Sequence, residues 1–165
     1  MDLIEVKVSS NVSPRGILTS PGSSGMVLSP TKLNPAIRTY TSGSDPPGYF
    51  YDDNQYTIDG TGAETIDLTD LTDVEGVAID GTNMKLQYLR MQCPTTNSAL
   101  VGVKEGDTNG YLLGASLSTI AVPCNPGGRL EMEFADQLSD ISVTAKTLKF
   151  TGSVGDVFQV EFIIG

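Results

Sequence analysis

The C-terminal part of the chain alternates between apolar and polar residues. Within 130–134 and again within 158–164, every second residue is apolar, and most residues between them are charged or polar. Shorter runs of the same kind occupy 141–145 and 148–150. A period of two is typical of β-strands that bury one face. The pattern therefore predicts four closely spaced strands at this end of the chain.

Further strand-like stretches lie upstream at hairpin spacing. The longest is 84–93, whose alternation shifts between Tyr88 and Leu89, which predicts either a β-bulge or a strand covered on both faces. Because Asn109-Gly110 is a strong turn dipeptide, we expect 98–104 to form a hairpin with 111–113. The other strand candidates are 55–58, 64–68 and 117–122, with turn signals at Asp59-Gly60 and at 126–128.

The composition agrees with a chain of short strands and turns. Glycine occurs 18 times and proline 9 times, only 18% of residues are charged, and no stretch places apolar residues at helical spacing. We therefore expect an all-β fold with almost no helix. Specifically, the pattern predicts an antiparallel β-sandwich, jelly-roll-like, with about eight or nine strands.

The N-terminal part has a different character. After a strand candidate at 2–8, six of the nine prolines fall between Ser9 and Gly48. Proline removes a backbone donor, so this stretch is predicted to be neither helix nor interior strand. We expect residues 1–48 to form an extended arm and 49–165 the β-domain, the alternative being a disordered leader. Apolar residues recur along the arm and are predicted to dock it on another surface: Ile17, Leu18, Met26, Val27, Leu28 and Ile37.

Four of the eleven aromatic residues gather where the arm meets the domain: Tyr49, Phe50, Tyr51 and Tyr56. Such a cluster can pin an arm to its domain, anchor a subunit interface, or stack against a ligand such as a sugar. We favour pinning and keep the other two interpretations open.

Charge is unevenly distributed. The chain carries a formal net charge of −10, yet residues 1–44 hold four basic and two acidic residues. The remaining chain is therefore strongly acidic and is expected to repel nucleic acid and anionic membranes. Cys93 and Cys124 are predicted to be buried free thiols, although a disulfide between them stays an alternative. The N-terminus lacks the pattern of a secretion signal, so we expect a soluble protein made in a cytoplasm.

The sequence contains little that indicates catalysis. Histidine is absent, which excludes Ser-His and Cys-His nucleophile pairs, and no glycine-rich phosphate loop precedes a helix. We therefore expect neither an enzyme nor a cofactor. Carboxylates are dense in one segment, and calcium binding there is the alternative to a solvated acidic loop. The residues concerned are Asp67, Asp70, Asp73, Glu75 and Asp80.

The strand pattern of 64–165 resembles small β-sandwich virion proteins of tailed bacteriophages. The similarity lies in the run ETIDLTDLTD, the strand MKLQYLRMQC, the segment NSALVGVKEG, the turn and strand PGGRLEMEF, and the C-terminal ISVTAKTLKFTGSVGDVFQVEFIIG. The resemblance implies a capsid decoration (cement) or head-fibre type protein, often a homotrimer, located in the virion. It implies the major capsid protein or other virion proteins as partners, and it does not extend to the arm.

Two hypotheses follow from these observations. The first is a non-enzymatic capsid decoration protein that binds a phage head through its arm and subunit contacts. The second is a receptor- or carbohydrate-binding β-sandwich module of the tail-fibre or adhesin type. The second predicts that the aromatic cluster around Tyr56 is an exposed platform, whereas the first predicts that it is buried.

Overall fold

The computed structural model describes residues 6–9, 37–40, 50–72, 76–114, 121–134 and 137–165, and in these ranges it contains strands and turns but no helix. The prediction of an all-β antiparallel fold is confirmed. The strands are β1 (Val6–Ser9), β2 (Ile37–Tyr40), β3 (Phe50–Thr57), β4 (Ala63–Asp67), β5 (Leu71–Thr72), β6 (Ala78–Ile79), β7 (Leu86–Gln92), β8 (Val101–Glu105), β9 (Val122–Cys124), β10 (Arg129–Glu133), β11 (Thr147–Thr151) and β12 (Val157–Ile164).

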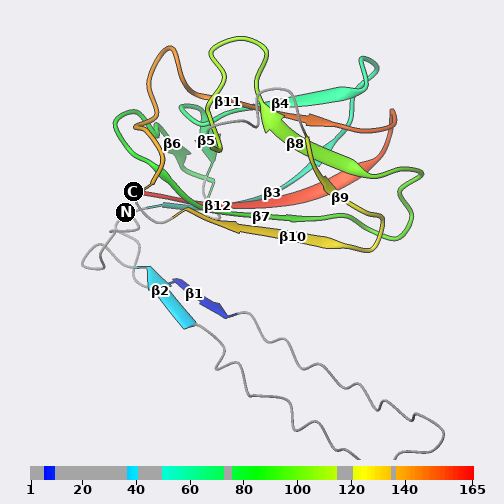
Figure 1. The fold of residues 1–165 in the computed structure, drawn as a ribbon, viewed down its shortest axis with the longest axis horizontal. Coiled ribbons are helices and arrows are strands. Elements are labelled where there is room, and N and C mark those ends of the chain that lie inside the picture. The colour runs from blue at the N-terminus through cyan, green and yellow to red at the C-terminus, as the bar shows by residue number, and fades with distance from the viewer. Residues whose placement is uncertain (1–5, 10–36, 41–49, 73–75, 115–120, 135–136) are drawn as a thin grey trace, which may run out of the picture.

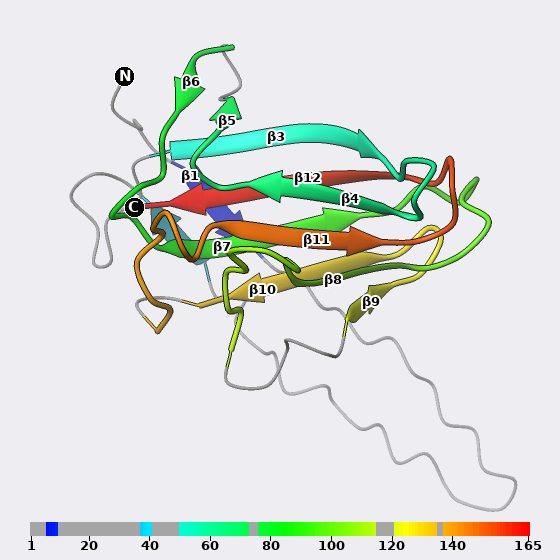
Figure 2. The ribbon, with the colours of Figure 1, turned by 90° about the horizontal axis from the view of Figure 1, so that it is seen from above.

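Two four-stranded sheets face each other (Figure 1), with the orders β10-β7-β12-β3 and β4-β11-β8-β9. Four antiparallel pairs are nested along the chain: β3 with β12, β4 with β11, β7 with β10, and β8 with β9. The pairings of β12 with β7 and of β11 with β8 complete the sheets. The eight strands are thus one long hairpin folded over on itself, and strands of both sheets follow one long axis (Figure 2).

The core lies between the two sheets. Phe150 on β11 and Phe158 on β12 are fully buried and stack with ring centroids 4.7 Å apart, so the sheets contact each other through aromatic side chains. The inward residues of β12 are the apolar ones predicted from the sequence, since alternate residues from Phe158 to Ile164 belong to the core. Leu130, Met132 and Phe134 also pack against this core, as the alternation of 130–134 predicted.

The shift of pattern in β7 has two structural counterparts. In the pairing of β12 with β7, Ile163 is opposite Tyr88, but the next residue, Ile164, is opposite Leu86. Gln87 is therefore an extra residue in β7. The bulge therefore lies one residue before the position that the sequence indicated. In addition, Leu86 to Leu89 are all buried, so the strand is covered on both faces there.

The predicted hairpin of 98–104 with 111–113 is wrong. Strand β8 pairs instead with β11 and β9. Asn109 does adopt the left-handed conformation of a turn (φ 51°), but its carbonyl accepts hydrogen bonds from the backbone N–H groups of Lys146 and Thr147. Tyr111 is buried, and its N–H donates to the Thr147 carbonyl at the start of β11 (2.8 Å), so this segment lies beside β11.

The strand predicted at 141–145 is also absent. Ile141 is buried, but Ser142 and Ala145 exchange backbone hydrogen bonds of 3.0 Å in each direction and close a tight turn. Val143 at the tip of this turn is 74% exposed. Strand β9 differs from prediction as well, because it contains Pro123, which is tolerated since β9 is an edge strand.

The predicted arm pairs with itself. Strand β1 is antiparallel to β2, with Val6 opposite Tyr40 and Ser9 opposite Ile37. Of residues 1–48, the structure thus describes two strands that pair with each other. The division into 1–48 and 49–165 stays a prediction, and β3 begins just after that boundary.

Candidate interaction surface at one end of the domain

The nested topology gathers four turns at one end of the domain. They connect β3 to β4, β7 to β8, β9 to β10, and β11 to β12, and they comprise residues 58–62, 93–100, 125–128 and 152–156. We refer to these residues as the tip. Although the four segments span almost a hundred positions of sequence, they lie together at the right-hand end of the domain in Figure 1.

Asp156 connects two of these turns. Its carboxylate is buried and accepts hydrogen bonds from the Ser98 backbone N–H (2.7 Å), the Ser98 hydroxyl (3.1 Å) and the Ala99 backbone N–H (3.1 Å). These donors stabilise the charged form, so the Ser98 N–H above all holds the pKa of Asp156 below its usual range. Asn97 adds a reciprocal pair with Val157, donating to its carbonyl at 2.7 Å and accepting from its N–H at 3.0 Å.

Backbone hydrogen bonds connect the remaining turns. The Ile58 N–H donates to the Asp156 carbonyl (2.8 Å), and the Gly155 N–H donates back to Ile58 (2.9 Å). On the other side, the Gly127 N–H donates to the Cys93 carbonyl (2.9 Å). Gly127 has a φ of 74°, which favours glycine and lets the 126–128 turn close as the sequence predicted. The tip is consequently one hydrogen-bonded unit.

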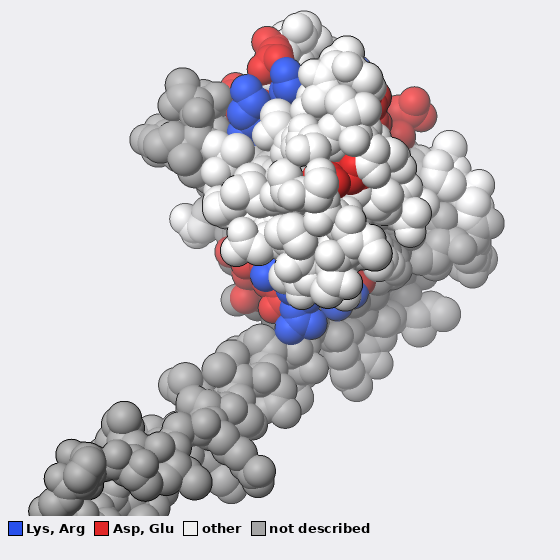
Figure 3. Space-filling view, turned by 90° about the vertical axis from the view of Figure 1, so that its right-hand side faces the viewer, with Lys and Arg blue, Asp and Glu red and all other residues white. Residues whose placement is uncertain are grey.

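The tip carries almost no charge. Its only charged residues are Asp59 and Asp156, and Asp59 is already bonded within its own turn by the N–H (2.7 Å) and hydroxyl (2.6 Å) of Thr61. Viewed end-on in Figure 3, most of this surface is uncharged. Leu100 and Val154 expose 47% and 64% of their surface there. Protein interfaces are depleted of charge at their centres, so this end is suited to contact another protein.

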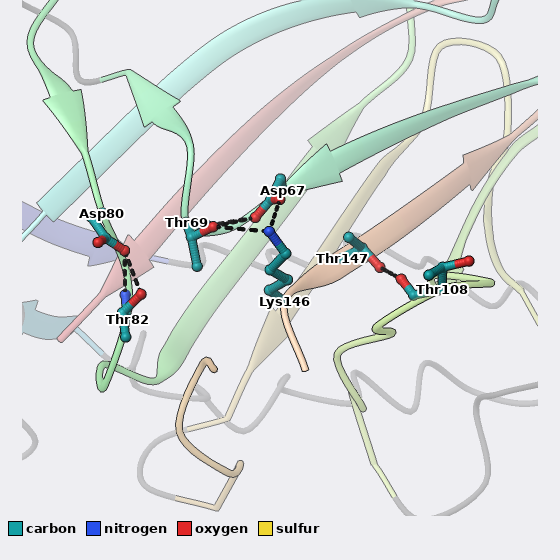
Figure 4. A network of polar contacts seen from close by, with 7 residues as sticks. All are labelled: Asp67, Thr69, Asp80, Thr82, Thr108, Lys146 and Thr147. Carbon is teal, nitrogen blue, oxygen red and sulfur yellow. Dashed lines mark hydrogen bonds and ion pairs between the residues drawn. The ribbon is translucent and has the colours of Figure 1, made fainter. Parts of the chain in front are cut away.

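The opposite end of the domain holds the acidic segment considered for calcium (Figure 4). Asp67 accepts hydrogen bonds from the N–H and hydroxyl of Thr69 and forms an ion pair of 2.6 Å with Lys146. Asp80 accepts from the N–H and hydroxyl of Thr82 in the same way. Both carboxylates thus stabilise turns. Among the residues that the structure describes, no group of three potential metal ligands occurs; Asp73 and Glu75 lie outside them.

Only some of the predicted docking and aromatic residues are among those that the structure describes. Ile17, Leu18, Met26, Val27, Leu28 and Tyr49 lie outside the described residues, and Ile37 begins β2. Phe50 and Tyr51 begin β3, at register positions opposite Ile164 and Ile163. Tyr56 is half-buried and stacks on Phe158 at 5.7 Å between centroids, so this ring packs against the core.

Both cysteines are free and buried, in agreement with the interpretation that we favoured. Cys93 follows β7 and Cys124 ends β9, and the Cys124 thiol lies 3.8 Å from the Met91 carbonyl. Burial, together with the neighbouring Cys124 thiol, raises the pKa of Cys93 to about 12. The Cys93 thiol is thus protonated and a weak nucleophile in the folded protein.

Sequence reasoning missed the tip as a surface, although a signal was present. Each of its four segments lacks lysine and arginine, and two of them, at Asp59-Gly60 and at 126–128, had been predicted as turns. The described residues contain no helix able to cross a membrane. Comparison of the chain with protein-family models, with curated proteins and with solved structures gives no match.

Proposed function

We propose that this protein is a non-enzymatic structural component of a tailed-bacteriophage virion, a capsid decoration protein that is made in the host cytoplasm and binds the phage head. Its partners in this proposal are the major capsid protein or other virion proteins, and it assembles as a homotrimer. The β-domain contacts the shell through the tip, and the N-terminal arm adds a second attachment. Two linked attachments raise the overall affinity through effective concentration.

The observation that carries the proposal is the low charge density of the tip, which has two charged residues on a strongly acidic chain. The chain has a net charge of −10, yet the four turns contain no lysine or arginine and only two carboxylates, of which that of Asp156 is buried and hydrogen-bonded to Ser98 and Ala99. Burying such a surface against a partner requires little desolvation of charge. A decoration protein needs this kind of contact and does not need a reactive site.

The strand order supports the jelly-roll interpretation. In an eight-stranded jelly roll the first strand pairs with the last, the second with the seventh, and so on inward, which is the nesting found for β3, β4 and β7–β12. Double-sheet folds of this type occur in viral capsid proteins and also in lectins. The fold is therefore compatible with both hypotheses, and the choice depends on the surface.

The surface favours the structural role over carbohydrate binding. A sugar platform requires exposed aromatic rings, but none of the four tip segments contains an aromatic residue. Tyr56, the member of the aromatic cluster whose side chain the structure describes, packs on Phe158. We therefore retain the decoration protein as the proposed function.

The proposal is tested on particles of the phage that encodes the chain. Purified virions are analysed by quantitative mass spectrometry and by immunogold electron microscopy, and the protein is expected in many copies on the head. Light scattering of the purified protein is expected to give the mass of a trimer. Absence of the chain from purified particles, or labelling confined to the tail, would overturn the proposal.

The role of the tip is tested separately with a matched pair of variants. Val154→Asp places a charge at the tip, whereas Val143→Asp places the same charge on an exposed valine in the 142–145 turn of the opposite end. Particles assembled without the protein are mixed with each variant and sedimented. Wild type and Val143→Asp should co-sediment with the heads. Val154→Asp should bind at least about tenfold more weakly, because binding would remove the new carboxylate from water.

A further inference from the structure

Strand β10 forms one edge of the β10-β7-β12-β3 sheet, and its outer side pairs with none of the strands that the structure describes. On its inner side, the Cys93 N–H donates to the Gly128 carbonyl at 3.1 Å. Since alternate residues of an antiparallel strand bond to the same neighbour, the even-numbered residues of β10 bond to β7. The N–H and carbonyl groups of Arg129 and Glu131 therefore point away from the sheet, and no described residue bonds to them.

The other three edges of the two sheets are less suited to receive a further strand. Strand β9 contains Pro123, which has no N–H to donate. On β4, the carbonyls of Ala63 and Asp67 already accept hydrogen bonds from the adjacent turns. On β3, the Asn54 side chain donates to the Thr72 carbonyl of β5 at 3.2 Å, so β5 lies beside this edge. The edge of β10 is thus the one best suited to pair with a further strand.

The core side of β10 is also open. Leu130 and Met132 pack against the core, yet both are only half-buried, whereas Phe158 and Val160 on the inner strand β12 are completely buried. The reason is that β12 has a neighbouring strand on each side, while β10 has β7 on one side. A further strand beside β10 would cover Leu130 and Met132 and remove apolar surface from water.

The outer face of β10 carries opposite charges two residues apart. Arg129 and Glu131 form an ion pair of 3.1 Å, and their side chains are 52% and 26% exposed. In a second β10 strand, antiparallel about a twofold axis at Leu130, Arg129 of each copy lies opposite Glu131 of the other. This register also aligns the outward backbone groups of both residues and places Leu130 opposite its own counterpart. The three central pairs thus join opposite charges or apolar side chains, and both kinds of pair stabilise antiparallel sheets.

We propose that a second copy of this chain pairs with β10 in this register, so that two β10-β7-β12-β3 sheets become one continuous sheet across a twofold axis. A pairing of two such short strands buries little surface, so the contact is transient in dilute solution. The trimer expected above has threefold symmetry, so this twofold contact joins chains of two different trimers. The contact involves copies of this chain alone, so it stands or fails independently of the virion proposal.

Covalent capture tests the register with two matched variants of the full chain, Leu130→Cys and Met132→Cys. Both replace a half-buried apolar residue on the core side of β10. The two copies of Leu130 form a non-hydrogen-bonded pair, whose Cα atoms lie about 4.5 Å apart, within the range that a disulfide spans. Met132 faces Gly128 of the other copy, so the two copies of Met132 are separated by about 13 Å along the strands.

Under oxidised glutathione, Leu130→Cys should therefore form a disulfide between the two introduced thiols, identified by mass spectrometry as a covalent dimer. It should form at least about tenfold faster than any dimer of Met132→Cys. Wild type should form none, because Cys93 and Cys124 are buried. No dimer from folded Leu130→Cys, or equally fast dimer formation by Met132→Cys, would overturn the proposal.

A second measurement uses the charges and does not depend on how Leu130→Cys folds. Sedimentation velocity over a concentration series compares wild type with Arg129→Glu and with the double reversal Arg129→Glu/Glu131→Arg. The single substitution gathers four carboxylates around the axis and should weaken association at least about tenfold. The double reversal restores both opposite-charge pairs and should match wild type. Unchanged association of Arg129→Glu, or no recovery in the double reversal, would contradict pairing through β10.

Discussion

Replacing Tyr111 by phenylalanine should destabilise the domain through its backbone rather than through its core volume. The Tyr111 ring is buried, and its hydroxyl donates a hydrogen bond of 2.6 Å to the Ser139 carbonyl while accepting one of 3.2 Å from the Leu86 N–H. One oxygen atom therefore joins the segment after β8, the start of β7 and the segment before β11. Burial raises the pKa of Tyr111 to about 12, so the hydroxyl remains a donor across the accessible pH range.

The expected loss of stability depends on whether the two hydrogen-bond partners of the Tyr111 hydroxyl can bond to water instead. Leu86 is fully buried, so its N–H would lose its acceptor without access to water, at a cost of about 1–3 kcal/mol. Ser139 is exposed, so its carbonyl can be rehydrated and only the net hydrogen bond of about 1 kcal/mol is lost. Tyr111→Phe should thus lower the free energy of unfolding by about 2–4 kcal/mol.

Urea unfolding followed by circular dichroism measures this difference. The matched control is Leu112→Ala, a truncation of the neighbouring exposed side chain, which should change stability by less than about 0.5 kcal/mol. If Tyr111→Phe were as mild as this control, the hydroxyl would not be the connection that we describe. The reasoning from the buried Leu86 N–H would then be refuted.

Two further predictions concern titratable groups. Asp156 has a lowered folded-state pKa, so its stabilising contribution is present above the unfolded-state pKa of about 4 and is lost as pH falls through the folded-state value. Asp156→Asn should therefore unfold at lower urea concentration at pH 7 and show a flatter acid dependence; an unchanged acid profile would contradict the role of the Ser98 and Ala99 donors. Cys93 and Cys124 should react with a disulfide reagent at pH 8 only as the protein unfolds, since both are buried; rapid reaction of either thiol in the native protein would contradict their placement.

Local pattern predicted the strands well where one face is buried. The alternation within 130–134 and 158–164 corresponds to β10 and β12, because each of these strands has an inner face against a single core. The same reasoning failed at 141–145, where Ile141 alone is anchored and the following residues close a turn. A short apolar alternation does not distinguish a strand from an anchored turn.

The local sequence pattern did not predict which strands pair with each other. The Asn109-Gly110 signal identified a turn, but β8 found its partner in β11, more than forty residues away. Likewise β3 pairs with β12 across almost the whole domain. Such registers depend on which side chains fill the common core. The tip was missed for the same reason, since it exists only once four distant turns are brought together.

The outer sheet face shows where the period-two pattern stops being informative. In β12 the outward positions are polar at Gln159 and Glu161 but apolar at Val157 and Ile163. Val157 is only half-buried, whereas Ile163 is completely buried, so an apolar residue at an outward position does not by itself predict burial. The difference depends on what surrounds each residue: Ile163 lies opposite the buried Tyr88, next to the extra residue Gln87 of β7. Such surroundings are set by register and bulges, which local pattern does not determine.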